Sequence, residues 1–198
     1  MFYKPEDGHG LPHDPFKACV VPRPIGWIST LSADGVPNAA PYSYFNAVGS
    51  APPMAMFSSN GTKAGAPKDT VTNVEATGEF VVNIATEALS AAVKGSAAPL
   101  PAEVDEIAQM GLTAAPSRLI KPPRIAESPI HLECVLHQVV DLPSADPAER
   151  VAVVFGRVVG VHIDETVLTN GLVDATKLRP LARMGYREYA AVREVFEL

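Results

Sequence analysis

Residues 68–73, Lys-Asp-Thr-Val-Thr-Asn, place a cation, an acid, hydroxyl groups and an amide close together, ahead of the apolar run 79–85. A helix that begins here presents unpaired N–H groups and about half a positive charge at its N-terminus. Together with the ammonium of Lys68 and the hydroxyl of Thr70, this predicts an anion site. We expect Asp69 or Thr70 to cap the helix, so that the Asp69 carboxylate does not repel the anion. The alternative is an ordinary capped surface helix with a solvated lysine.

A second polar group lies where two neighbouring strands are expected to end. Ser29 and Thr30 are near the end of the first strand, and hydroxyls, an amide and aromatic rings are near the end of the second. That second cluster consists of Ser43, Tyr44, Phe45 and Asn46. Such side chains at adjoining strand ends can hold a planar heterocycle with a polar edge. The alternative interpretation places Phe45 in the core and the other residues in a loop.

His162 is the candidate catalytic residue. It shares one face of a predicted strand with Asp164, and a histidine there can donate a hydrogen bond to a reduced cofactor or a substrate carbonyl. The alternative is a hydrogen-bonded strand histidine with no chemical role. No metal site is expected, because His131 and His137 lie far apart on one strand and the cysteines lack CxxC spacing.

A series of short strands is expected to position these side chains. Residues 23–48 are predicted to form a hairpin around an Asp34-Gly35 turn. Pro37 and Pro41 mark its second strand as an edge strand or a bulged one. Further strands are expected at 53–59, 79–85, 131–140 and 151–164, the last two paired as a hairpin.

Only short helices are expected between the strands. The first begins at Asp69 or Thr70 and runs to about Thr77, where Gly78 suits a left-handed C-terminal residue. Two more are expected at 87–95 and 103–110. Antiparallel strands with short inserted helices predict a mainly β, barrel-like domain.

The composition is typical of a single globular domain. The 198 residues, 47% hydrophobic and 19% charged, suit one domain over 1–198 with an N-terminal arm at 1–15. The net charge of -6 gives no support for nucleic-acid binding. No apolar run approaches the roughly 20 residues of a membrane helix, and the N-terminus has no signal-peptide core. We therefore expect a cytoplasmic protein. The sequence contains no dinucleotide fingerprint, P-loop or nucleophile motif.

The polar groups and their flanking segments occur in a recognisable order. That order is RPIGWIST, PNAAPYSYFN, KDTVTNVEATGEFVVNIA, VVGVHID and LRPLARMGYREYA, within about residues 16–190. In this ordered set the chain resembles the flavin reductase-like FMN-binding proteins. The resemblance implies a split β-barrel with short inserted helices, which holds FMN non-covalently at the interface of a homodimer. It also implies reaction with NAD(P)H or other redox partners.

The resemblance further implies roles for individual residues. It assigns Ser29 and Thr30 to the ribityl-phosphate end of the flavin, and Lys68 and Thr70 to the phosphate. It assigns the isoalloxazine ring to Ser43, Tyr44, Phe45 and Asn46, and it places His162 near the reactive ring.

The chain departs from the family pattern near its end. The family often has two glycines after an Arg-Leu pair, whereas this chain has Arg183, Met184, Gly185 and Tyr186. A tyrosine at this place would narrow the substrate side of the pocket.

The leading hypothesis is an NAD(P)H-dependent flavin oxidoreductase, in which hydride passes from the nicotinamide to the flavin. No protein acid or base is strictly required for this transfer, which agrees with the missing triad. The rival is an FMN-binding electron-transfer protein, flavoredoxin-like, with no reductase activity of its own. A flavin-free barrel is the third alternative. A partner oxygenase is a candidate acceptor of the reduced flavin.

Overall fold

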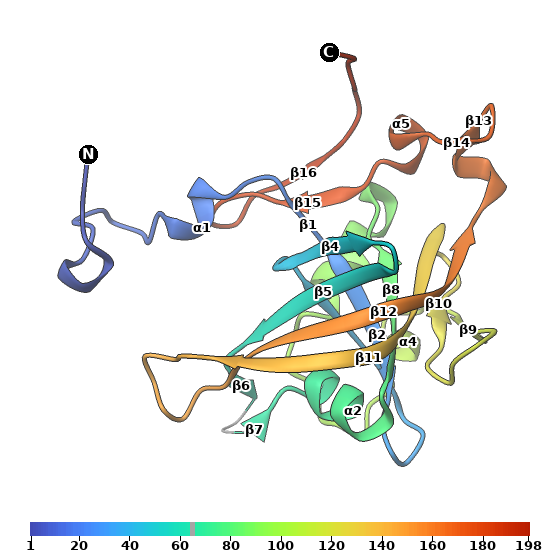
Figure 1. Cartoon of the computed structure of the whole chain (residues 1–198), viewed down its shortest axis with the longest axis horizontal. Coiled ribbons are helices and arrows are strands. Elements are labelled where there is room, and N and C mark those ends of the chain that lie inside the picture. Colours follow the sequence, from blue (N-terminus) through green and yellow to red (C-terminus); the bar gives the residue numbers. More distant parts are fainter. Residues whose placement is uncertain (64–65) are drawn as a thin grey trace.

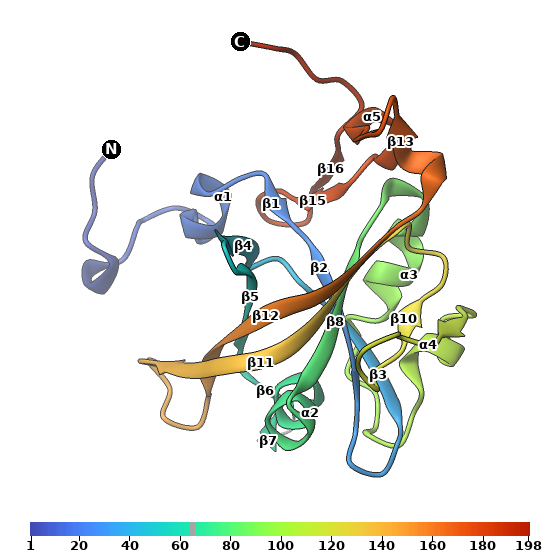
Figure 2. The ribbon, with the colours of Figure 1, turned by 45° about the vertical axis from the view of Figure 1, so that its right-hand side comes forward.

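Figure 1 shows a computed structural model of the chain, which describes residues 1–63 and 66–198. Within these residues the largest sheet has seven antiparallel strands, in the order β3-β2-β8-β11-β12-β5-β4. The strands curl around one another rather than lying flat (Figure 2). The expected mainly β architecture is therefore confirmed.

The elements have the following bounds. The seven-stranded sheet contains β2 (Gly26–Leu31), β3 (Pro37–Tyr42), β4 (Phe45–Ser50), β5 (Pro53–Asn60), β8 (Glu79–Ile84), β11 (Ile130–Leu142) and β12 (Val151–Ile163). A three-stranded sheet contains β1 (Arg23–Pro24), β15 (Leu181–Arg183) and β16 (Tyr189–Ala191). The two-stranded sheets pair β6 (Thr62–Lys63) with β7 (Ala66–Pro67), β9 (Ala114–Ala115) with β10 (Arg124–Ile125), and β13 (Leu168–Thr169) with β14 (Leu172–Val173). The α-helices are α1 (Phe16–Cys19), α2 (Asp69–Thr77), α3 (Ser90–Gly95), α4 (Glu106–Gln109) and α5 (Ala175–Leu178). The short 3-10 helices are η1 (Pro5–Asp7), η2 (Glu87–Leu89) and η3 (Glu165–Val167).

Both predicted hairpins are present. β2 pairs with β3 across a turn in which Gly35 has φ 85, and β3 is an edge strand of the sheet, as its prolines predict. β11 pairs with β12, and the register shifts beside Gly160. The strand β4 was not expected: the chain turns after Tyr42, and Phe45 begins a strand that pairs with β5 at the opposite edge.

The two edges of the sheet approach each other and close the barrel. The rings of Tyr42 on β3 and Phe57 on β5 lie 4.8 Å apart. Phe45 on β4 lies directly over Gly26 on β2, where an added Cβ would come within 2.6 Å of the Phe45 ring. A glycine is therefore required at residue 26 for the two strands to come this close.

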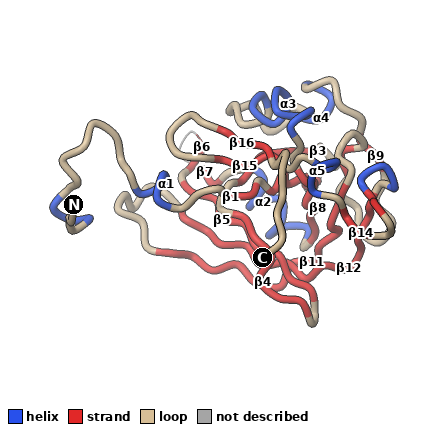
Figure 3. The backbone as a smooth tube through the Cα atoms, turned by 90° about the horizontal axis from the view of Figure 1, so that it is seen from above, coloured by secondary structure: helices blue, strands red, loops and turns tan. Residues whose placement is uncertain are grey.

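Apolar side chains fill the barrel and also cover its outside. Ile28, Phe57 and Phe80 are buried inside, where the barrel end is covered by α2. The adjacent residue Trp27 points to the opposite face of β2 and packs beneath α3 and α4. Figure 3 shows these two helices on one side of the strands. Each fully buried side chain of this size contributes about 1.5–3 kcal/mol of hydrophobic stabilisation.

Helix α2 begins and ends as the sequence predicts, but its cap differs. It spans Asp69–Thr77, and Gly78 follows it in the left-handed conformation with φ 73. The N-cap residue is Lys68, and no side chain caps the helix. The expectation that Asp69 or Thr70 serves as the cap is therefore wrong: Asp69 is the first helical residue, and the Thr70 hydroxyl donates to Asn38 instead.

The chain ends lie outside the barrel. The N-terminal arm extends away from it (Figures 1 and 3), and the C-terminal strands β15 and β16 return to pair beside β1. Among the described residues, no helix has the length and apolar character needed to cross a membrane.

Candidate functional site

Two neighbouring cavities lie along the edge strand β3 and share Pro41 and Ala97 in their walls. We call them the helix-end cavity, of about 690 Å³, and the arginine cavity, of about 470 Å³. The helix-end cavity is lined by Asn38, Ala40, Pro41, Tyr42, Lys68, Asp69, Thr70, Ser96, Ala97, Ala98, Pro99, Leu100, Pro101 and Glu106. The arginine cavity is lined by Asp14, Lys17, Arg23, Ile25, Pro41, Ser43, Tyr44, Val93, Ala97, Arg183, Tyr186 and Tyr189. The shared residues place the two cavities side by side along β3, and we call the two cavities together the groove.

Lys68 is the cation of the helix-end cavity. Its side chain is half-buried, and within the described residues it makes no ion pair. Burial lowers the pKa of its ammonium below the usual value of 10.5, although the charge of Glu149 opposes the shift. An anion bound next to Lys68 would favour its charged form, since no carboxylate of the described residues forms an ion pair with it.

The first turn of α2 is held by a buried polar network centred on Asn38. The amide oxygen of Asn38 accepts from the hydroxyls of Thr70, at 2.9 Å, and Thr30, at 3.3 Å. Its amide nitrogen donates to Glu106 at 2.6 Å, and Glu106 also accepts from the backbone N–H of Ala39 at 2.7 Å. Asn73 donates to Thr30 at 3.0 Å. This network joins α2, α4 and β3, and it fixes the start of the helix against the groove.

The helix-end cavity is not strongly positive. The carboxyl groups of Asp69 and Glu106 line it together with Lys68, so the positive potential for an anion comes from Lys68 and the N-terminus of α2 together. The hydroxyl proton of Thr70 is donated to Asn38. Thr70 can therefore donate a hydrogen bond to a phosphate only if its hydrogen bond to Asn38 is broken.

Tyr42 contributes to the wall of the helix-end cavity, but its ring lies in the barrel core, 4.8 Å from the ring of Phe57. Its hydroxyl oxygen is buried and has no hydrogen bond of full geometry within the described part of the chain, although the hydroxyls of Thr70 and Ser59 lie near it. Burial raises the pKa of Tyr42 to about 12, although the nearby hydroxyls of Thr70 and Ser59 oppose the shift. Because this oxygen is enclosed by the core, it is not open to a ligand in the cavity.

Arg23 forms the inner wall of the arginine cavity. Its guanidinium donates to the carbonyls of Lys17, Val20 and Met184, and its contact with the Ser43 hydroxyl is 3.5 Å. It is only 7% exposed, and no carboxylate of the described residues pairs with it. Its positive charge is therefore hydrogen-bonded but not neutralised.

The outer wall of the arginine cavity comes from the C-terminal strands. Arg183 stacks over the ring of Tyr189, with 4.5 Å from the guanidinium carbon to the ring centroid, and donates to the carbonyl of Tyr186. Tyr44 lies under Arg23 at 5.9 Å. Cations and aromatic faces thus alternate around this cavity.

The structure brings four of the predicted cofactor residues to the groove. Lys68 and Thr70 line the helix-end cavity, and Ser43 and Tyr44 line the arginine cavity. Thr30 lies behind the groove, where it supports Thr70 through Asn38.

Three other predicted residues lie away from the groove. Ser29 is completely buried on the other face of β2, where its hydroxyl donates to the carbonyl of Pro123 at 2.6 Å. Phe45 packs on Gly26 and Asn46 is exposed on β4. None of the three lines either cavity.

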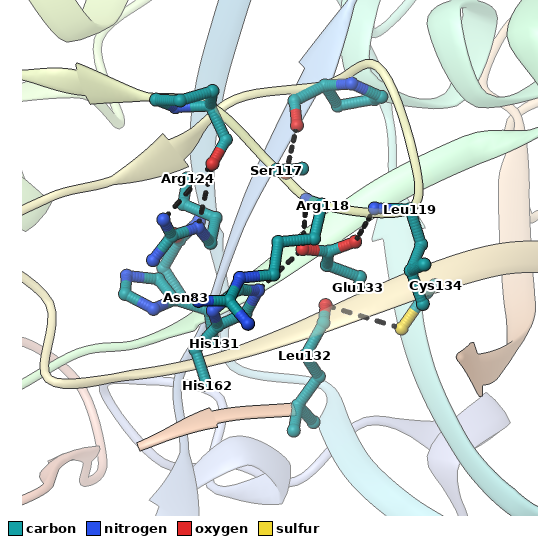
Figure 4. A network of polar contacts seen from close by, with 12 residues as sticks. Asn83, Ser117, Arg118, Leu119, Arg124, His131, Leu132, Glu133, Cys134 and His162 are labelled. Atoms are coloured by element: carbon teal, nitrogen blue, oxygen red, sulfur yellow. Dashed lines mark hydrogen bonds and ion pairs between the residues drawn. The ribbon is translucent and has the colours of Figure 1, made fainter. Parts of the chain in front are cut away.

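His162 lies on the outside of the barrel, in the network of Figure 4. Its Nε2 is 2.5 Å from Oε1 of Glu133, and its ring lies 5.9 Å from that of His131. Glu133 is completely buried and accepts from the backbone N–H groups of Arg118 and Leu119, both at 2.8 Å. Burial opposes ionisation of Glu133, but these three donors outweigh it and hold its pKa below the usual range. His162 therefore helps to fasten the loop after β9, and it lines neither cavity.

The cysteines give no sign of a chemical role. Cys134 is buried in the barrel, and burial raises the pKa of its thiol to about 12. Cys19 is exposed. Within residues 1–63 and 66–198, no group of His, Cys, Asp and Glu side chains has the arrangement of a metal site.

Sequence reasoning missed the residues that make the arginine cavity positive. Arg23 and Arg183 are separated by most of the chain, and only the pairing of β1 with β15 brings them together. The local signals were weak: an arginine between two prolines, and an arginine in a short apolar segment.

Comparisons with known proteins support a common ancestry along nearly the whole chain. Residues 18–182 match the flavin reductase like domain. An uncharacterized protein of Aquifex aeolicus is 40% identical over 171 residues, which cover 86% of this chain and 84% of that protein.

Two solved structures share the fold and a substantial part of the sequence. Nitrilotriacetate monooxygenase component B from Bacillus cereus has a TM-score of 0.90 and 35% identity, covering 100% of this chain and 98% of that one. The 2-nitrobenzoate 2-nitroreductase of Pseudomonas fluorescens has a TM-score of 0.80 and 28% identity, covering 92% and 86%. The expected split-barrel architecture is confirmed, and the chain belongs to the flavin reductase-like domain family.

Proposed function

We propose that this protein is an FMN-binding, NAD(P)H-dependent flavin oxidoreductase. One observation carries the proposal: of two adjoining cavities along β3, one holds a half-buried lysine without an ion pair among the described residues, and the other is walled by hydroxyls, aromatic rings and arginines. The lysine end suits a phosphate and the other end suits a planar ring. Membership of the flavin reductase-like domain family supports the same assignment.

The residues of the groove fit FMN in charge and in hydrogen-bonding capacity. Lys68 and the N-terminus of α2 would hold the phosphate, and Thr70 would join them by exchanging its bond to Asn38. Ser43 and Tyr44 would lie beside the ring.

When bound, the flavin would accept a hydride from the nicotinamide and pass the electrons to an acceptor. The protein supplies position and electrostatics for this reaction. The charges of Arg23, Arg183 and Lys17 create a positive potential at the ring end of the groove, which favours the negative charge that reduction adds there. No acid or base of the chain needs to act, and His162 has no part in this mechanism, because its imidazole is bound to Glu133 outside the groove.

A homodimer is part of the proposal. β4 is an edge strand with exposed backbone, and its residues from Asn46 to Ser50 are all exposed. Apolar side chains on it and on the end of β12, Val48, Val161 and Ile163, are 49%, 56% and 43% exposed. An unpaired edge with apolar side chains invites pairing with another chain, and a second copy would also cover Asn46.

The acceptor of the electrons is proposed from one of the similar structures. Nitrilotriacetate monooxygenase component B is named as part of an oxygenase system. We infer that a partner oxygenase is a suitable acceptor of reduced flavin from this protein as well. Because NAD(P)H is a metabolite of the cytoplasm, the proposal places the protein there.

The test is anaerobic mixing of the FMN-loaded protein with NADH and, separately, with NADPH. The flavin absorbance is expected to bleach within seconds with at least one of them, and added FMN should then be turned over repeatedly. If neither nicotinamide bleaches the flavin while dithionite does, the protein is an FMN-binding electron carrier of the flavoredoxin type. If FMN does not bind at all, both assignments fail.

A further inference from the structure

Tyr186 occupies a backbone conformation that suits glycine. Its φ is 53, in the left-handed region that a bulky side chain seldom adopts. The turn around it is well anchored: Met184 donates to Glu188, Glu188 donates to Gly185, and Arg183 donates to the carbonyl of Tyr186. Non-glycine residues kept in this region are often found at binding and catalytic sites.

The backbone of the turn is also packed against α1, whereas the Tyr186 ring itself is 51% exposed. A Cβ added to Gly185 would lie 2.6 Å from the Cβ of Ala18. The ring of Tyr186 lines the arginine cavity, and its centroid lies 5.7 Å from the ring of His13 in the N-terminal arm. Tyr186 and His13 therefore form an aromatic pair at the rim of this cavity.

The charges behind this rim predict what the cavity accepts. Lys17, Arg23 and Arg183 line it against a single acid, Asp14. Arg23 and Arg183 are direct cross-strand partners, an arrangement in which like charges repel. No carboxylate of the described residues pairs with either. An anionic group between them would remove this repulsion, and Tyr44 and Tyr189 offer aromatic faces for a ring.

We propose that the arginine cavity takes a planar aromatic ring that carries a carboxylate, and that Tyr186 limits the size of that ring. When FMN is bound, this ligand would lie beside the flavin ring in the same cavity, and in this respect alone the inference rests on the proposed function. Arg183 is available to the anionic group, Arg23 adds its positive charge from the inner wall, and the Tyr186–His13 pair sets the width available to the ring. Tyr186 is thus a specificity-determining residue.

The charge requirement is tested by calorimetric titration of the protein, with and without FMN, using benzoate and its neutral analogue benzamide. Benzoate is expected to bind at least about tenfold more tightly than benzamide, the scale of one charge-assisted hydrogen bond. Equal affinities, or no binding of either, would overturn the proposal.

The size requirement is tested with 2-naphthoate and the variant Tyr186→Gly. Glycine accepts the backbone conformation, so the variant should fold and melt no lower than the natural protein. It is expected to bind 2-naphthoate about tenfold or more tightly than the natural protein does, and benzoate with nearly unchanged affinity. An unchanged preference between the two acids would contradict the role of Tyr186.

Asn170→Gly is the matched control. Asn170 has φ 52 in the β13–β14 turn and does not line the arginine cavity, so this variant relieves the same backbone conformation elsewhere. It should leave both affinities unchanged, and a gain in 2-naphthoate binding equal to that of Tyr186→Gly would overturn the proposal. FMN binding is titrated in parallel by quenching of flavin fluorescence. Failure of FMN to bind would count against the proposed function, while the carboxylate titrations would still decide this inference.

Discussion

Arg23 and Arg183 face each other as Cα partners across the β1–β15 ladder, and both line the arginine cavity. Their environments differ. Arg23 is buried and donates to three backbone carbonyls, whereas Arg183 is partly exposed and stacks on Tyr189. One arginine therefore joins α1 to the C-terminal turn, and the other is available to a ligand.

This difference predicts unequal costs of substitution. Arg23→Met leaves three carbonyls without their donor, and the free energy of unfolding should fall by roughly 2–4 kcal/mol. Arg183→Met removes a partly exposed cation that lies beside another arginine. The free energy of unfolding should therefore change by no more than about 1 kcal/mol. Urea unfolding of both variants measures this. A similar loss in the two variants would show that Arg23 does not support the fold in the way described.

Lys68→Ala should weaken FMN binding by about 1–3 kcal/mol, the usual scale of a charge-assisted hydrogen bond. Riboflavin, which lacks the phosphate, should bind almost as well as before. Lys94→Ala, an exposed lysine on α3 outside both cavities, serves as the control. Fluorescence titration gives the four affinities, and equal losses for FMN and riboflavin would mean that Lys68 acts on folding or on the ring instead.

FMN affinity should also depend on pH through Lys68. Burial lowers the pKa of this lysine below 10.5 in the free protein, and only the ammonium form attracts the phosphate. Affinity for FMN relative to riboflavin should therefore decline with rising pH, and the decline should come at a lower pH than for a lysine with the usual pKa. Lys68→Arg, whose guanidinium stays charged, should remove this decline. A decline that persists in Lys68→Arg would point to another titrating group.

Glu133→Gln should destabilise the barrel by about 1–3 kcal/mol at neutral pH, because the carboxylate accepts from two backbone N–H groups and from His162. The pKa of Glu133 is lower in the folded protein than its usual value of 4.5. Its contribution is therefore complete above that value and is lost as pH falls through the folded pKa.

The stability difference between the natural protein and Glu133→Gln should accordingly narrow in acid, as chemical unfolding at several pH values will show. Glu103→Gln, at an exposed position, should change little at any pH. His162→Ala should destabilise in the same sense without slowing flavin reduction. A slower reduction with unchanged FMN affinity would return His162 to a catalytic role.

Val48→Lys should disrupt the proposed homodimer by placing a charge on the exposed edge strand β4. Light scattering should give about twice the 20.9 kDa chain mass for the natural protein and about the chain mass for the variant. Leu172→Lys, at another exposed apolar residue on β14, should leave the dimer intact. A natural protein that stays monomeric with full flavin occupancy would rule the dimer out.

Local features of the fold were predictable because their causes are local. Gly35 permits the tight turn of the first hairpin, and Gly78 ends α2 in the left-handed conformation. Pro37 and Pro41 confine β3 to an edge, because proline cannot donate to a neighbouring strand. Alternation of side chains along β2 put Trp27 and Ile28 on opposite faces, although it did not show that both faces are buried.

The positions of the candidate site residues depended on contacts that no local pattern contains. Ser29 was expected beside a ligand, but the loop around Pro123 covers that face of β2. His162 was expected near a reactive ring. The pairing of β12 with β11 instead places its imidazole against the carboxylate of Glu133. In both cases the hydrogen-bond partner of the side chain comes from a distant segment of the chain, which no local pattern reveals.

The sequence by itself determined the β-rich pattern, the start of α2 with its lysine, and the resemblance of the ordered segments to one family. The tertiary structure alone decided which polar residues face a common groove. Arg23 and Arg183 meet only because the C-terminal strand returns beside β1. Lys68 lies near them only because the edge strand β3 contributes Pro41 to both cavities. Propensity and turn chemistry act over a few residues, whereas a binding site is made by packing between residues that are far apart in the chain.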